Sequence, residues 1–253
     1  MVHFDLHGRV AVITLDRPEA RNAVNGETSA AIEEAIDRIE SDDEIWVGIV
    51  TARGPVFCAG ADLKEIAAGR EMSLRTERGG FGGITRRVRT KPMIAAVDGL
   101  ALAGGCEITL ACDLIVASTA AGFGTPEVKR GLIAGAGGVF RLARVLPLPA
   151  AMELALTGDP LAAKRAYDLG MVNDLCEPGQ VLERAMALAD RICANGPVAV
   201  RTSRDLMLRT LHSDDAEAWK ESNDAWQVIL ASEDYHEGPR AFVEKRPPVW
   251  TGR

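Results

Sequence analysis

The chain has 253 residues, of which 47% are hydrophobic and 26% charged, and its formal net charge is −7. This length and apolar content suffice for one large domain, or for one domain with an appendage, around a substantial core. The acidic balance argues against a nucleic-acid partner, because proteins that bind nucleic acids usually carry a basic surplus.

The cysteines and the N-terminal stretch favour a reduced environment without a membrane partner. The five cysteines are scattered and form no CxxC pair. The N-terminal stretch MVHFDLHGRVAVITL carries charge early and lacks a signal-peptide pattern. No uncharged apolar run reaches the roughly 18 residues that a membrane span needs. We therefore expect a soluble, cytoplasmic protein.

Two strands and one helix are predicted near the N-terminus. RVAVITL (9–15) is typical of a strand and is followed by the turn-prone sequence DRPEARN. In residues 26–40, isoleucines recur on one helical face while acidic and basic residues occupy the other. IWVGIVT (45–51) predicts a second, buried strand.

The next segment is rich in glycine and predicts loops. ARGPVFCAGADL (52–63) favours a loop that leads into a helix near Asp62. Residues 69–90 are polar and contain GGFGG (79–83), so we expect a mobile loop there that enters a helix before Lys91.

Strands and a short helix alternate in the middle of the chain. MIAAVDG (93–99) predicts a strand, GGCEITLAC (104–112) a short helix and DLIVAS (113–118) another strand. The strands are apolar on both faces. This pattern indicates an α/β layered core.

From about residue 146 the pattern becomes helical, with little strand signal. We place a boundary near Gly196, which divides a catalytic core (1–195) from a helical assembly segment (196–253). This segment contains three tryptophans that it is too small to bury alone. We therefore expect them to pack onto the core or onto a neighbouring subunit: Trp219, Trp226 and Trp250.

Several motifs of catalytic chemistry are missing. The four histidines lie far from any acidic or cysteine cluster, so no metal site is predicted. GxSxG, HExxH, the GxxxxGK phosphate loop and the GxGxxG fingerprint are all absent. If the protein is an enzyme, we expect its acid and base groups to be carboxylates.

Two glycine-containing loops share one design. FCAGADL (57–63) and LAGGCE (102–107) each follow a predicted strand and each open a helix. Small residues let a ligand approach the backbone, and a helix start leaves N–H groups without partners. Two such loops can form an oxyanion hole, in which one donor contributes on the order of 3 kcal/mol. The alternative is that the glycines only permit tight packing.

Three stretches resemble the signature regions of one family. FCAGADLKEI (57–66), KPMIAAVDGLALAGGCEITLACDLIVAS (91–118) and AGFGTPEVKRGLIAGAGG (121–138) are similar in order and spacing to those of the enoyl-CoA hydratase/isomerase family, also called crotonases. The resemblance runs essentially from end to end. It implies an α/β crotonase (ClpP-like) spiral of repeated ββα units with a helical C-terminal trimerisation segment, and hence a homotrimer or a dimer of trimers.

The resemblance also implies roles for particular residues. The oxyanion-hole donors would be the backbone N–H groups of Ala61 and Gly104, which would hold the thioester carbonyl of a coenzyme A ester. In the hydratase branch, glutamates stand at the positions of Glu107 and Glu127. Glu107 would orient and activate a water molecule, and Glu127 would be the main proton donor to the α-carbon, with the two acting as a coupled pair. The resemblance thus implies a carbon–oxygen lyase that reversibly hydrates a 2-enoyl-CoA thioester to a 3-hydroxyacyl-CoA in fatty-acid and lipid metabolism.

Each glutamate, taken alone, also has a purely structural interpretation. Glu107 could stabilise the start of its helix, which contributes less than about 1 kcal/mol and does not account for a carboxylate among apolar residues. Glu127 could be a surface residue at the start of a helix. Lys129 and Arg130 follow it, and we expect them to face solvent.

Coenzyme A enters as part of the substrate, and no permanently bound cofactor is expected. Its candidate contacts lie around the first glycine loop, at the second and in the C-terminal tail. Asp62 and Asp113 also have structural interpretations, as a helix cap and a strand-start residue. The candidate contacts are Arg21, Ala23, Val24, Ala61, Asp62, Leu63, Lys64, Gly104, Phe242 and Lys245.

Two departures from the family pattern lie close to these loops. Ala103 stands where the family often has the first of three glycines, and Ala134 stands where a proline is common. Ala103 narrows the loop at 102–107 slightly, and Ala134 can alter the pocket wall.

The acyl group and the exact reaction stay open at this point. The stretch GGFGGIT and the tail EGPRAFVEKRPPVWTGR are also similar to the carnitine-pathway branch, crotonobetainyl-CoA hydratase (carnitinyl-CoA dehydratase). Another crotonase reaction through the same enolate, such as double-bond isomerisation, is a second alternative. A coenzyme A ester-binding protein without turnover is a third.

Overall fold

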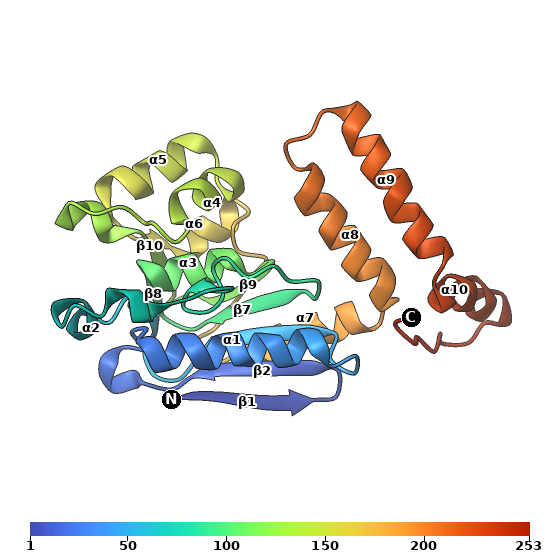
Figure 1. Cartoon of the computed structure of the whole chain (residues 1–253), viewed down its shortest axis with the longest axis horizontal. Helices are drawn as coiled ribbons and strands as arrows, with labels where there is room; N and C mark the ends of the chain where they lie inside the picture. Colours follow the sequence, from blue (N-terminus) through green and yellow to red (C-terminus); the bar gives the residue numbers. More distant parts are fainter.

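A six-stranded sheet in the order β1-β2-β3-β7-β9-β12 forms the base of the fold in the computed structural model, which describes residues 1–253 (Figure 1). Only the pair of β1 and β2 is antiparallel. The strands are β1 (Val2–His7), β2 (Val10–Leu15), β3 (Val47–Ala52), β7 (Met93–Val97), β9 (Leu114–Ser118) and β12 (Asp174–Cys176).

Both faces of this sheet are covered by apolar side chains. On one face, the buried isoleucines of α1 (Gly26–Ser41) join the main core. On the other face, α7 (Val181–Cys193) packs its small buried residues against β2, β3, β7 and β9. The predicted strands and the predicted α/β core with two apolar faces are therefore confirmed.

A second, four-stranded sheet runs in the order β11-β10-β8-β4. Three successive units each give one strand to the large sheet and the next to the small one, in the pairs β3 and β4, β7 and β8, and β9 and β10. A helical turn follows each: α2 (Leu63–Ala67), α3 (Gly104–Ala111) and the 3₁₀ helix η3 (Pro126–Arg130). The small sheet consists of β4 (Val56–Cys58), β8 (Leu100–Leu102), β10 (Gly122–Gly124) and β11 (Leu161–Ala162).

The C-terminal helices extend away from the two sheets (Figure 1). They are α8 (Pro197–Thr210), α9 (Asp215–Leu230) and α10 (Glu233–Glu244). Three further helices lie before α7 in the chain: α4 (Gly138–Val145), α5 (Leu148–Thr157) and α6 (Ala163–Asp168). Asp113 at the start of β9 anchors α8, because it accepts hydrogen bonds from Arg204 at 2.9 Å and from Arg89 at 3.0 Å. No helix combines the length and the apolar composition that crossing a bilayer requires. The division at residue 196 stays a prediction.

Two expectations about local structure are wrong. The segment 69–90 contains the 3₁₀ helix η2 (Glu71–Leu74) and the short strands β5 (Arg75–Thr76) and β6 (Gly80–Phe81), followed by turns and no helix before Lys91. Residues 79–85 are packed, not loose: a Cβ atom at Gly83 would lie 2.2 Å from the carbonyl oxygen of Ser29 in α1. The glycines permit this close approach of backbones.

The later part of the core also contains strands that its helical pattern hides. β11 and β12 lie after residue 146, and β12 completes the edge of the large sheet beside β9. Each has only two or three residues, which is too short for a period-2 pattern to be visible.

Candidate active site

The order of the small sheet brings the candidate residues together. β4, β8 and β10 are parallel neighbours, so their carboxyl ends lie side by side. Ala61 follows β4, Gly104 follows β8 and Glu127 follows β10. Glu107 is one turn into α3. Residues that are far apart in the sequence therefore share one edge of one sheet.

The first loop presents the N–H group of Ala61. Val24 donates to Gly60 O at 2.8 Å and accepts from Asp62 N at 2.8 Å. Because successive N–H groups of an extended segment point to opposite sides, the Ala61 N–H points away from Val24. The Asp62 side chain caps α2 by accepting from Lys64 N at 3.1 Å, as predicted, and Arg17 contacts its other oxygen at 3.2 Å.

The second loop lies directly against the first. A Cβ atom at Gly60 would be 2.9 Å from Gly104 N, so the two backbones touch. Gly104 is the first residue of α3, and its N–H therefore has no intrahelical acceptor. Ala103 adopts φ +50°, where an L-residue is strained. This is the conformation that a glycine would adopt without cost, so the departure at residue 103 keeps the loop geometry at the expense of strain.

Glu107 is buried, with 3% of its surface exposed. Its Oε1 accepts hydrogen bonds from the backbone N–H groups of Ala136 at 2.7 Å and Gly138 at 2.9 Å, just before and at the start of α4. Burial raises the pKa of the Glu107 carboxyl, and the charge of Glu127 adds to this, while the two N–H groups and Arg141 oppose it. The two donors occupy one oxygen and leave Oε2 for a further partner.

Glu127 stands in η3 with an unsatisfied oxygen. Its Oε2 is buried and has no hydrogen-bond partner in the protein. Burial raises the pKa of the Glu127 carboxyl, which favours its protonated form. An orphaned buried oxygen requires a partner, and a substrate or water molecule at this edge of the sheet can supply one. The following Lys129 and Arg130 are exposed, as predicted, and Lys129 pairs with Asp159 at 2.5 Å.

The other candidate contacts divide into two groups. Those near the first loop stay close to it: Val24 pairs with Ala61, and Lys64 is exposed in α2. The tail residues do not join them within this chain. Phe242 is 85% exposed on α10, which lies at the opposite end of the molecule from α2 (Figure 1).

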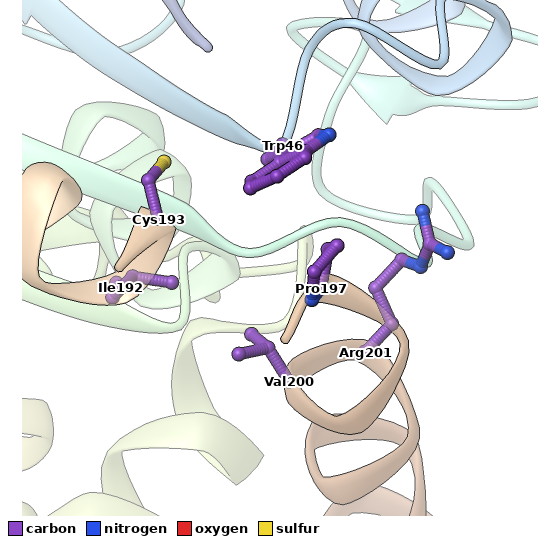
Figure 2. Close-up of a pocket in the computed structure, with 6 residues that line it drawn as sticks. All are labelled: Trp46, Ile192, Cys193, Pro197, Val200 and Arg201. Carbon is purple, nitrogen blue, oxygen red and sulfur yellow. The ribbon is translucent and has the colours of Figure 1, made fainter. Parts of the chain in front are cut away.

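A small hollow lies away from the glutamates. Figure 2 shows it between the end of α7 and the start of α8, lined by side chains such as Trp46, Ile192 and Pro197. Its volume is about 10 Å³. Such a space holds at most one water molecule, so it is not a substrate site.

Three features of the site are missing from the expectations based on the sequence. The turn at 136–138 holds Glu107, and the ring of Phe81 packs on Gly104. Arg141 links the turn at 136–138 to the turn that follows Phe81. The sequence GAGG (135–138) is a usable signal, since it is glycine-rich immediately before a helix. Arg141 carries no signal of its own, because it follows an ordinary helical pattern. No cluster of three His, Cys, Asp or Glu residues that could hold a metal ion is present.

The chain is similar to known proteins along almost its whole length. The sequence profile of the enoyl-CoA hydratase/isomerase family matches residues 5–253. A mevalonyl-coenzyme A hydratase of Aspergillus fumigatus is 41% identical over 95% of this chain and 91% of its own. A carnitinyl-CoA dehydratase of Salmonella typhimurium is 38% identical over 100% of this chain and 98% of its own.

Solved structures give the same result. The crystal structure of an enoyl-CoA hydratase from Mycobacterium tuberculosis superposes with a TM-score of 0.96 at 46% identity, covering 100% of this chain and 99% of that one. A carnitinyl-CoA hydratase from Mycobacterium avium superposes with a TM-score of 0.79 at 44% identity, covering 100% of this chain and 98% of that one.

Proposed function

Because the chain belongs to the enoyl-CoA hydratase/isomerase family, with the crotonase fold and the hydro-lyase activity of an enoyl-CoA hydratase, we propose that its reaction uses Glu107, Glu127 and the N–H groups of Ala61 and Gly104. The observation that carries this proposal is that a buried carboxyl, a half-buried carboxyl and two outward N–H groups lie together at the ends of adjacent parallel strands.

The two N–H groups bind the thioester carbonyl oxygen of a 2-enoyl-CoA. When water adds to the β-carbon, the electron pair of the double bond moves toward this oxygen and forms an enolate. Donors that are fixed before the reaction stabilise that charge, and each contributes about 3 kcal/mol in comparable sites. The contact between the loops, seen at Gly60 and Gly104 N, supports their action on one oxygen atom.

The two carboxyls divide the proton transfers. Glu107, stabilised as an anion by two N–H donors and Arg141, takes a proton from the attacking water. Glu127, whose pKa burial raises, gives its proton to the α-carbon as the carbonyl re-forms. The product is a 3-hydroxyacyl-CoA. A proton then passes from Glu107 to Glu127, directly or through solvent, and dehydration is the same path reversed.

Coenzyme A extends from the first loop in this proposal. Ala23, Val24 and the segment from Asp62 to Lys64 lie beside Ala61, and exposed Lys64 offers a cation to a phosphate. No other cofactor is needed. Since α10 lies far from α2 in its own chain, Phe242 and Lys245 would reach coenzyme A only across a subunit interface (Figure 1).

A quaternary-ammonium substrate is the second candidate. Relatives named carnitinyl-CoA dehydratase, 38% identical over the whole chain, support it as a variant of the same reaction. Both candidates need hydration at the β-carbon, so they differ only in the acyl group. The two carboxyls favour hydration over isomerisation or binding without turnover, because adding water requires one group to accept a proton and another to supply one.

We also propose a homotrimer, or a dimer of trimers, in the cytoplasm. The exposed apolar side chains of the C-terminal helices support assembly, since Trp219 is 68% exposed and Trp226 53% exposed. The five free cysteines support a reducing compartment such as the cytoplasm. If the substrate is a simple enoyl-CoA, the reaction fits a role in fatty-acid metabolism.

Loss of the enoyl-thioester absorbance tests the proposal. Purified protein is offered crotonyl-CoA and crotonobetainyl-CoA, beside Glu107→Gln and Glu127→Gln. We expect the unmodified protein to hydrate at least one of them and both variants to lose that activity. Tight acyl-CoA binding without turnover across a chain-length series would support the binding protein instead. Hydration that both variants retain would contradict the assigned roles.

A further inference from the structure

Arg141 lies behind the site and touches both segments that support it. It stands in α4, one turn after the residues that hold Glu107. Its Nη2 donates to Thr85 O at 2.7 Å, and its Nη1 donates to Ala136 O at 3.2 Å. We propose that Arg141 is a positioning residue that fixes the orientation of Glu107 and keeps this carboxylate ionised during hydration.

The contact with Ala136 sets the direction of two donors at once. Glu107 Oε1 receives the N–H groups of Ala136 and Gly138. The carbonyl that Arg141 holds belongs to the peptide unit between these two N–H groups. Because that peptide unit is bonded to both flanking peptides, its displacement would shift both N–H donors relative to Glu107.

The backbone makes room for the guanidinium at this point. Gly137 adopts φ +107°, and a Cβ atom there would lie 2.2 Å from Arg141 Nη1. The side chain thus folds back over the start of its own helix, in space that only a glycine leaves free.

The contact with Thr85 extends the support to the oxyanion hole. Thr85 Oγ1 donates to Phe81 O at 3.1 Å, and the ring of Phe81 packs on Gly104. Arg141 therefore links the turn beneath Gly104 to the turn around Glu107. A lysine has one donor point and cannot reproduce the fork that spans two carbonyls.

The charges around this pair give Arg141 an electrostatic role. Glu107 faces Glu127 from η3, Arg141 from α4 and the neutral thiol of Cys106 in its own helix. Arg141 in turn faces Glu107, Arg144, Arg89 and the neutral thiol of Cys112. Among the groups acting on Glu107, Arg141 is the cation. Its removal leaves only the N–H groups of Gly138 and Ala136 to oppose burial and Glu127, which raise the pKa of Glu107.

The sign of the expected change follows from the role of Glu107 as a base. Only the ionised form accepts a proton, so kcat falls as pH decreases through the pKa of Glu107. A raised pKa moves this acid limb to higher pH.

The test is the pH dependence of kcat and KM in Arg141→Gln and Arg141→Lys, with Arg144→Gln as control. Arg144 is exposed on the same helix, and its guanidinium lies over the ring of Phe140, as that of Arg141 does. In Arg141→Gln we expect kcat at neutral pH to fall about 10- to 100-fold, KM to change less, and the acid limb to move up by about one pH unit. Arg144→Gln should keep kcat and the profile of the unmodified enzyme.

Arg141→Lys separates geometry from charge. It should retain the acid limb but lose kcat, and this result stands as the test if Arg141→Gln does not fold. An unmoved acid limb in Arg141→Gln, or an unchanged kcat in Arg141→Lys, would overturn the inference. The inference rests on the proposed role of Glu107. If Glu107→Gln stays active, that role fails; if Glu107→Gln is inactive while the profile of Arg141→Gln is unmoved, only the inference about Arg141 fails.

Discussion

Gly104→Ala perturbs the proposed oxyanion hole through one defined clash. A Cβ atom at residue 104 would lie 2.3 Å from Cε1 and 2.4 Å from Cζ of Phe81. Carbon atoms pack comfortably at about 3.5 Å, so the two segments must separate by about 1 Å. The Phe81 ring is only 8% exposed, and its turn is fixed against α1 through Gly83. The start of α3 is therefore the part that moves, and the Gly104 N–H moves with it.

A displacement of about 1 Å in a positioned group costs on the order of 100-fold in rate. Loss of one oxyanion donor has a similar effect, about 100- to 1000-fold in kcat. We expect Gly104→Ala to lower kcat about 100-fold, with a smaller change in KM, in the absorbance assay with an enoyl-CoA. Gly196→Ala is the control, because the nearest atom to its Cβ would be 3.6 Å away.

A second substitution tests the cause of that loss. Leucine lacks the Cε1 and Cζ atoms with which the new methyl group would collide. Phe81→Leu combined with Gly104→Ala should therefore recover at least part of kcat. A Gly104→Ala enzyme within twofold of the original kcat, or a double variant no faster than Gly104→Ala, would refute this reasoning.

Two further predictions concern stability and pH. Asp113→Asn leaves the buried Arg89 without its anionic partner, so we expect about 3–5 kcal/mol of destabilisation and a Tm lower by about 6–20 °C. The exposed Asp205→Asn should change Tm little in calorimetry, and equal effects of the two would contradict the account. Burial opposes ionisation of Asp113, but its cationic partners outweigh this and lower its pKa. The stability that Asp113 contributes is therefore present at pH values above its pKa in the unfolded chain, and it is lost as pH falls through its lower pKa in the folded protein. The dependence of kcat on pH should be bell-shaped, with both limbs above the usual glutamate pKa of about 4.3, because burial raises the pKa of Glu107 and of Glu127. A kcat that stays constant over the pH range above this value would contradict the assignment.

The sequence predicts those parts of the fold and site that depend on long or regular patterns. Runs such as RVAVITL and DLIVAS carry enough apolar residues to identify strands, and both are strands in the structure. Glu107 is identifiable because a carboxylate in an apolar helix needs a specific reason to be there. Its neighbours across space are not identifiable in this way, since the order of β4, β8 and β10 is decided by tertiary pairing.

The segment around Phe81 shows why composition misleads. Three of its four glycines have positive φ, and a polar stretch with such residues is typical of a mobile loop. In the structure Gly83 instead lets the chain lie against the backbone of α1, and Gly79 lies against the backbone of Gly83. Arg141 illustrates a second limit, because its proposed role depends on the carbonyl oxygen of Thr85, which is 56 positions away in the sequence.

The most direct measurement of the central claim is kcat for enoyl-CoA hydration in Glu107→Gln, Glu127→Gln and the double variant. If the carboxyls act as one unit, each single substitution lowers kcat by about 10²- to 10⁴-fold. The double variant is then no more than about tenfold slower than the slower single one, because the unit is already disabled. A single variant within about tenfold of the original kcat, or losses that multiply fully in the double variant, would contradict a coupled pair of glutamates.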